Sequence, residues 1–209
     1  YCDLPSKNYV YAITLDIDSD IILASRAVRA IEHPHFSSVA VLSFSSSSTL
    51  KGLDTAYSKL FSSQGNGYSF CGFTLENDVF KCGNYTGKGI CKIKDFYSRC
   101  AHAFPNKRIL SHDFIEGATA GCINCDVSVT ESAPLTLGQN LARDSRWIRG
   151  DWQLLPYLLP TVKDERGNKT ENRIGLVNKA HIASNTFASL YPVFLLASLL
   201  FSRGLLTLF

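Results

Sequence analysis

The sequence predicts an α/β fold, in which β-strands alternate with helices around a layered core. Residues 10–15 (VYAITL) form a short apolar run that ends abruptly in the acidic segment 16–20. Such a run is typical of a buried strand that carries carboxylates at its carboxyl end. Residues 21–31 place apolar side chains at helical spacing before Pro34 stops the helix. Residues 39–44 then repeat the strand pattern, and this alternation indicates a layered α/β domain.

The remaining elements follow from apolar spacing and from the positions of Gly, Pro and Ser. The pattern predicts loops at 45–48, 62–72 and 163–173, a glycine-containing turn at 80–89, strands at 90–93 and 125–129, and helices at 50–61, 95–103, 114–120 and 137–159. Because the segment 163–173 is rich in charge, we expect it to lie on the surface.

Charge and cysteine content limit the possible partners. The 21 basic and 18 acidic residues give 21 − 18 = +3, which is too small to indicate a nucleic-acid partner. The seven cysteines are an odd number without the regular framework of a disulfide scaffold. Cys122 and Cys125 have the spacing of half a zinc site, but no second pair follows, which favours free thiols.

The first candidate site is the carboxylate pair Asp16 and Asp18 at the end of the strand 10–15. Two carboxylates can hold a hard divalent cation, and phosphate oxygens of a bound nucleotide can complete its shell. Such a metal ion would offset the charge that develops on a diphosphate leaving group. A solvated acidic turn is the alternative, but the end of a buried strand lies at the usual ligand-binding edge of an α/β sheet.

The second candidate is the segment 111–117 (SHDFIEG), which carries Asp113 as a candidate general base. Transfer of a group onto a hydroxyl requires a proton acceptor near the attacking oxygen, and a carboxylate can serve there. The alternative role for Asp113 is a helix N-cap, and the two roles are compatible. His112 is expected either to orient Asp113 or the acceptor, or to pack.

The third candidate is the helical segment that carries Arg143, Arg146 and Trp147. At spacings of three and four residues these side chains share one helix face. Guanidinium groups bind diphosphate through charge-assisted hydrogen bonds, and indole rings provide an apolar face for sugars. The alternative is a solvated basic face with an amphipathic tryptophan.

The fourth candidate is the loop that contains Tyr85, Thr86 and Gly87, followed by Lys88 and Gly89. Its two glycines allow the backbone to approach a ligand closely, although a plain turn explains them as well. The spacing is not that of a P-loop.

Taken in order, these motifs resemble the inverting, processive glycosyltransferases of the cellulose, chitin and hyaluronan synthase type. Within this type, the sequence resembles more closely the glycosyltransferase domain of cyclic β-1,2-glucan synthases. The segments that carry the resemblance are TLDIDS (14–19), GNYTGKGICKIKDF (83–96), RILSHDFIEG (108–117) and RDSRWIRGDWQLLPYLLP (143–160).

The resemblance implies an A-type glycosyltransferase fold, UDP-glucose as donor, and Mg²⁺ or Mn²⁺ as cofactor. It implies that Asp16 contacts the nucleotide-sugar region and Asp18 the metal. Asp113 would deprotonate the attacking 2-hydroxyl of the growing glucan. The Arg–Trp helix would bind diphosphate and acceptor, and Tyr85 to Gly87 would border the acceptor channel. It further implies an inner-membrane location with a cytoplasmic catalytic face.

The resemblance divides the chain into three parts. Residues 1–160 would form part of the glycosyltransferase catalytic core, 161–186 a polar loop and interfacial segment, and 187–209 the start of a transmembrane region. A buried C-terminal helix is the alternative for 187–209, because a full span needs ~20 apolar residues and only 190–202 is free of charge.

Two further alternatives to a β-1,2-glucan synthase stay open at this point. A related membrane synthase with another sugar or linkage would carry the same motif order. An inactive fragment or pseudoenzyme is also compatible, because the chain begins at Tyr1 without methionine or a signal segment. We therefore expect a piece of a longer protein that lacks the upstream strand of the nucleotide site.

Overall fold

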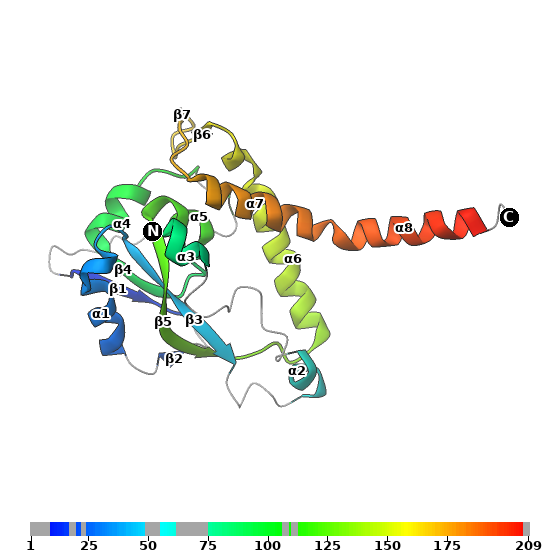
Figure 1. Ribbon diagram of the computed structural model, residues 1–209, viewed down its shortest axis with the longest axis horizontal. Helices are drawn as coiled ribbons and strands as arrows, with labels where there is room; N and C mark the ends of the chain where they lie inside the picture. The colour runs from blue at the N-terminus through cyan, green and yellow to red at the C-terminus, as the bar shows by residue number, and fades with distance from the viewer. Residues whose placement is uncertain are drawn as a thin grey trace.

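A mixed β-sheet forms the centre of the molecule (Figure 1). The computed structural model describes residues 9–16, 20–21, 24–48, 55–61, 75–105, 109 and 113–206. Within these residues the sheet has the order β1 (Tyr11–Thr14), β4 (Gly89–Lys92), β3 (Val41–Ser48), β5 (Cys122–Glu131) and β2 (Asp20–Ile21). β3 and β5 are parallel, whereas β4 lies antiparallel between β1 and β3. The carboxyl ends of β1, β3 and β5 therefore meet the amino end of β4 at one edge.

Helices surround the sheet and continue beyond it to the carboxyl end of the described chain. They are α1 (Ala24–Glu32), the 3₁₀ turn η1 (Pro34–Phe36), α2 (Ala56–Phe61), α3 (Leu75–Phe80), α4 (Ile93–Cys100), α5 (Asp113–Ala120), α6 (Leu137–Gln153), the 3₁₀ turn η3 (Leu155–Leu158), α7 (Leu176–Ser189) and α8 (Tyr191–Leu206). A small hairpin of β6 (Thr161–Lys163) and β7 (Lys169–Glu171) precedes α7. The predicted mixture of strands and helices is thus present, while the A-type glycosyltransferase fold stays a prediction.

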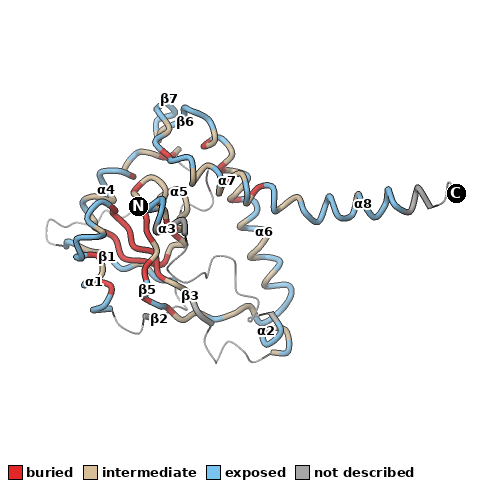
Figure 2. Tube along the Cα trace, in the orientation of Figure 1, coloured by how far each residue is buried: buried red, intermediate tan, exposed pale blue. Residues whose placement is uncertain are grey.

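The core has two parts, because successive side chains of a strand point to opposite faces of the sheet. Leu42 of β3 packs in a cluster with Ile31 of α1, whereas the neighbouring Val41 packs in a cluster with Ile115 of α5. Figure 2 shows the resulting buried centre of the sheet. The pair Cys122 and Cys125 divides between these two clusters, so the two thiols do not face one another.

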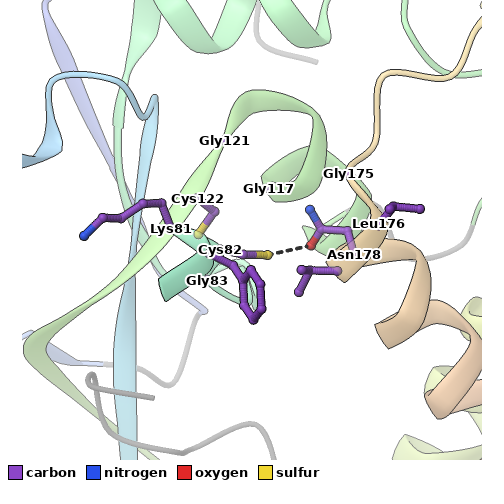
Figure 3. Close-up of a pocket in the computed structure, with 11 residues that line it drawn as sticks. Lys81, Cys82, Gly83, Gly117, Gly121, Cys122, Gly175, Leu176 and Asn178 are labelled. Atoms are coloured by element: carbon purple, nitrogen blue, oxygen red, sulfur yellow. Dashed lines mark hydrogen bonds between the residues drawn. The ribbon is translucent and has the colours of Figure 1, made fainter. Parts of the chain in front are cut away.

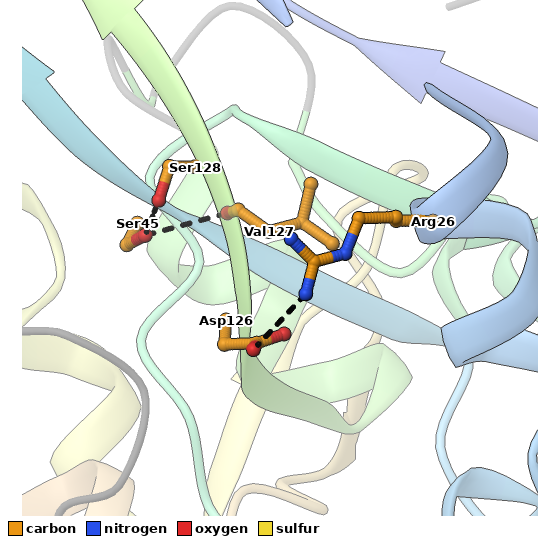
Figure 4. A network of polar contacts seen from close by, with 5 residues as sticks. All are labelled: Arg26, Ser45, Asp126, Val127 and Ser128. Atoms are coloured by element: carbon orange, nitrogen blue, oxygen red, sulfur yellow. Dashed lines mark hydrogen bonds and ion pairs between the residues drawn. The ribbon is translucent and has the colours of Figure 1, made fainter. Parts of the chain in front are cut away.

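The sequence predicts a loop for the serine run 45–48. In the structure these residues form the second half of β3. This half pairs with β5 beyond a shift in register. Before the shift Ser43 pairs with Asn124, and after it Ser45 pairs with Ser128. The Ser45 hydroxyl donates to the carbonyl oxygen of Val127 at 3.3 Å and lies 3.0 Å from the Ser128 hydroxyl (Figure 4). Serine side chains thus satisfy backbone groups at an irregularity of the sheet, which an apolar pattern does not reveal.

Two other segments differ from the predicted elements. The predicted helix 21–31 begins only at Ala24, because Ile21 belongs to β2 and faces Val129 of β5. The charged segment 163–173 forms most of the β6–β7 hairpin rather than a simple loop, with Gly167 at a φ of +83° in its turn. Exposed strands of this kind bury too little apolar surface to show a hydrophobic alternation.

α3 and the turn after it are attached to β5 through the side chains of Asn77 and Asn124. The Asn77 side chain accepts from the backbone N–H of Asn124 at 2.8 Å and donates to its carbonyl oxygen at 3.3 Å. The Asn124 side chain accepts from the N–H of Asn84 at 3.1 Å. Gly83 packs so closely on β5 that an added Cβ would lie 2.6 Å from the Asn124 nitrogen. These contacts fix the start of the loop that carries Tyr85 and Gly87.

The last helix, α8, is rich in leucine and phenylalanine and follows directly on α7. Within the described residues no single helix is both long and apolar enough to span a bilayer, although α7 and α8 satisfy the criteria together across a 41° bend. Figure 1 shows α8 extending away from the other elements, and Phe194, Leu200 and Phe201 on it are more than 60% exposed.

Candidate functional site

Charged side chains converge at the edge where β1, β3 and β5 end and β4 begins. Asp16 follows β1, Glu131 is the last residue of β5, and Lys88 directly precedes β4. The Lys88 ammonium lies 3.1 Å from Oδ2 of Asp16 and 2.5 Å from Oε2 of Glu131. One lysine therefore joins carboxylates from two strands that are not neighbours in the sheet.

Lys88 is fixed by its surroundings on both the main chain and the side chain. Its carbonyl oxygen accepts from the N–H of Phe44 in β3 at 2.9 Å, and its side chain is only 10% exposed. Glu131 also accepts a hydrogen bond from the hydroxyl of Ser46 in β3. The Asp16 side chain, in contrast, is 58% exposed and remains open to a ligand.

The charge of Lys88 is maintained by its two carboxylate neighbours. Burial of the ammonium group lowers its pKa, but hydrogen bonds and charge interactions with Glu131 and Asp16 outweigh burial, so the pKa of Lys88 lies above its ordinary value. The group is therefore a permanent cation at this edge at neutral pH.

Tyr85 connects the end of β1 to α5. Its hydroxyl forms a 2.8 Å hydrogen bond with the Thr14 hydroxyl, and the ring is buried. Gly117 of α5 packs directly against it, since an added Cβ there would overlap the Cβ of Tyr85. Burial raises the pKa of Tyr85, the Thr14 hydrogen bond opposes this, and Asp113 raises it further. Tyr85 is therefore a neutral hydroxyl that orients the end of β1.

Gly87 and Asp113, both predicted site residues, lie against each other. Gly87 has a φ of +83°, a conformation that glycine adopts without strain. A Cβ at this position would lie 3.0 Å from Oδ2 of Asp113, so the carboxylate rests against the bare backbone of the loop. Asp113 is the first residue of α5, where the helix dipole stabilises a negative charge. Its helix-end role and a chemical role are thus compatible in space.

The predicted Arg–Trp cluster is present on α6. The Arg143 guanidinium carbon lies 4.7 Å from the ring centre of Trp147, and its Nη2 donates to Asn140 at 2.7 Å. Arg146 is exposed on the same helix. The capping Thr136 accepts from the N–H of Gln139 at 3.2 Å and fixes the start of α6. That this cluster and Asp113 belong to one site stays a prediction.

Two predicted site residues, Asp18 and His112, lie outside the described residues, while Thr86 lies in the described loop between Tyr85 and Gly87. Within the described part of the chain, no group of three His, Cys, Asp or Glu side chains could hold a metal. At the strand edge Asp16 and Glu131 offer carboxylate oxygens with the right chemistry for a hard cation, but the ammonium of Lys88 already lies beside both. Metal binding by Asp16 and Asp18 stays a prediction.

A separate pocket of about 400 Å³ lies between the turn after α3, the carboxyl end of α5 and the start of α7 (Figure 3). The Cys82 thiol donates to Oδ1 of Asn178 at 3.1 Å across it. Of the predicted site residues that the structure describes, none lines this pocket.

The sequence patterns did not identify Glu131 and gave Lys88 no role. The available signals were an acidic residue close after the predicted strand 125–129 and a single cation between two glycines. Both are too common to indicate a site, because only the strand order brings them to Asp16.

The sequence of this chain is similar to part of one known synthase. No family model matches the chain. The chain is similar to the cyclic beta-(1,2)-glucan synthase NdvB of Rhizobium meliloti (strain 1021), with 30% identity over 132 residues or 63% of this chain. The chain spans only about 4% of the length of that relative. The similarity shows relatedness to part of a glucan synthase.

Proposed function

We propose that this chain contributes the catalytic site of an inverting glycosyltransferase that moves glucose from UDP-glucose to a growing β-1,2-glucan. The observation that carries the proposal is the carboxylate of Asp113 against the bare backbone of Gly87. This loop continues directly into the lysine that binds Asp16. The relatedness to a glucan synthase supports the same class of reaction.

In the proposed reaction, Asp113 accepts the proton of the acceptor 2-hydroxyl as that oxygen forms a bond to the anomeric carbon of glucose. The bond between this carbon and the diphosphate oxygen breaks, and UDP leaves with the bonding electron pair. Attack from the face opposite the diphosphate inverts the anomeric configuration. General-base catalysis by a positioned carboxylate contributes about 10²- to 10⁴-fold in rate.

The other residues bind and orient the reactants. Asp16 and Asp18 would hold Mg²⁺ or Mn²⁺, which supplies electrostatic stabilisation of the diphosphate when bound. Arg143 and Arg146 bind diphosphate, and Trp147 offers an aromatic face to the acceptor sugar. The open backbone at Gly87 allows the acceptor hydroxyl to approach Asp113 without a side chain between them.

We further propose that the helices α7 and α8 hold this site at a membrane surface. The exposed Leu and Phe side chains of α8 are the observation that favours this location. Such a surface is costly in water but is favourable in a bilayer or its interface.

The proposal is tested with membranes from cells that express the protein. Labelled UDP-glucose is supplied with Mg²⁺ or with EDTA, and the linkage of the product is mapped by methylation analysis. We expect 2-linked glucosyl residues that form only with the metal. Another linkage would assign the chain to a related synthase, and no incorporation would indicate an inactive fragment; either result would contradict the proposal.

A further inference from the structure

One face of α7 contacts two helices that carry predicted site residues, α5 and α6. Its contacting residues recur at the three- and four-residue spacing of one helix face. The opposite side of α7 is open to solvent, where Phe187 is 69% exposed. In Figure 1 α7 lies between α5 and α6. The residues of the contacting face are His181, Ile182, Asn185 and Ser189.

The contact with α5 lies beside the candidate base. The His181 imidazole stacks on the ring of Phe114, with the ring centres 6.3 Å apart and the planes at 26°. Phe114 directly follows Asp113 in the first turn of α5. Ile182 is 1% exposed and belongs to the same buried cluster as Ile115. α7 therefore packs against the turn that carries Asp113.

The contact with α6 is polar. The Asn185 side chain donates a hydrogen bond to the Asp151 carboxylate. Burial raises the pKa of Asp151, and this hydrogen bond opposes the rise. Nearby, the Trp152 indole N–H donates to the Ser189 hydroxyl at 3.0 Å. These bonds hold α7 against α6 about one turn beyond Trp147 of the Arg–Trp cluster.

We propose that α7 is a framework that holds α5 and α6 at a fixed separation, with His181 and Asn185 as positioning residues. The two residues lie about one turn apart on one helix, so a displacement at either contact is passed to the other. The roles of α5 in proton transfer and of α6 in diphosphate binding rest on the proposed function. The connection between the two helices does not.

The alternative is that each contact only stabilises its own pair of helices. Truncation of His181 would then loosen α5 without α6, and truncation of Asn185 would loosen α6 without α5. A framework predicts crossed effects instead, because the loss of either contact leaves α7 free to move relative to both helices.

Hydrogen–deuterium exchange followed by mass spectrometry tests the framework without any substrate. Peptides within 113–120 report on α5, and peptides within 137–153 report on α6. We expect His181→Ala and Asn185→Ala each to raise exchange in both helices. For His181→Ala the rise should be about fivefold, the factor that the loss of one stacked pair gives when exchange follows local opening. α1 packs in the other core cluster and should exchange as in the wild type.

Matched variants separate the contacting face from the rest of α7. Phe187→Ala removes an aromatic ring and Ser184→Ala a hydroxyl from exposed positions of α7, so neither should change exchange in α5 or α6. His181→Phe keeps a ring over Phe114 and should exchange as the wild type does. If His181→Ala does not fold, His181→Leu fills the same space without a ring and should show the same crossed rise.

Activity provides the second readout. His181→Ala should lower the maximal rate of glucose transfer by about tenfold and leave the UDP-glucose concentration for half-maximal rate unchanged, because the displaced group is the base rather than the donor site. His181→Phe should restore the rate.

Exchange that rises only in the helix in direct contact, or rises equally in α1, would overturn the inference. Crossed exchange with undiminished transfer in His181→Ala would overturn the positioning roles. Crossed exchange in a chain whose wild type forms no glucan would support the framework and reject the glucan assignment alone.

Discussion

The contact between Gly87 and Asp113 determines the geometry of the candidate site. The glycine has a left-handed conformation, and its missing side chain leaves the Asp113 carboxylate accessible from the loop. Both features depend on the same residue, so a substitution at Gly87 tests the site more sharply than one at a neighbouring loop position.

Gly87→Ala should lower glucose transfer by about 100-fold, because the added methyl group presses on the Asp113 carboxylate and a misplacement of about 1 Å at a reacting group costs about that factor. The strained backbone should also lower the free energy of unfolding by about 1–2 kcal/mol. Gly167→Ala is the matched control, since Gly167 has the same φ of +83° but open space around it. Equal losses of transfer in both variants would contradict the proposed contact.

At the residue scale the sequence predicted the chemistry of single side chains but not their partners. Asp16, Asp113 and Gly87 were predicted as site residues from motif and spacing. The partnership of Asp16 with Lys88 and Glu131 could not be predicted, because 72 positions separate Asp16 from Lys88 and only the order of the strands brings them together.

At the scale of elements, α6 is a preformed scaffold for the Arg–Trp cluster. Helical spacing alone predicted that Arg143 and Trp147 share one face, and the structure places them in cation–π contact. A guanidinium held over the indole in this way is restricted before any ligand arrives.

Trp147→Ala should mainly impair the use of acceptor, raising the acceptor concentration for half-maximal rate by about tenfold, the size of an aromatic stacking contribution. Initial rates at varied oligoglucan concentration measure this effect, and donor dependence should change little. Trp152→Ala is the control on the same helix, where the indole N–H instead donates to Ser189 at 3.0 Å. An equal effect of both substitutions on acceptor use would argue against the motif.

Elements with a clear apolar period were predicted well, and those without one were not. The strand predicted at 10–15 is present at 11–14, and the helix predicted at 137–159 is present at 137–153 and is followed by the 3₁₀ turn η3. The serine half of β3 and the β6–β7 hairpin were missed because their backbone pairing, rather than burial of apolar side chains, defines them.

At the scale of the whole molecule, a sheet-based body carries an apolar helix that extends away from it (Figure 1). The hydrophobicity of the C-terminal segment was evident from the sequence. The bend of 41° between α7 and α8 was not, because it depends on the backbone near Leu190 rather than on composition.

Leu195→Lys combined with Leu199→Lys should release the chain from membranes, because each charge placed in apolar lipid costs about 3 kcal/mol. Both leucines are about half exposed and lie one turn apart on α8. Sedimentation of membranes after high-salt washing measures the bound fraction, with Leu195→Ala combined with Leu199→Ala as the control. Undiminished membrane binding of the lysine variant would reject a membrane role for α8.

The assignment of Asp113 as the general base is tested most directly by the variant Asp113→Asn, which separates donor binding from turnover. If Asp113 is the base, the variant should bind UDP-glucose with metal as tightly as the wild type while glucan synthesis falls by at least about 100-fold. Equilibrium binding of labelled UDP-glucose and the initial rate of incorporation are measured on the same membranes. Undiminished synthesis, or a loss of donor affinity that accounts for the lower rate, would contradict the assignment.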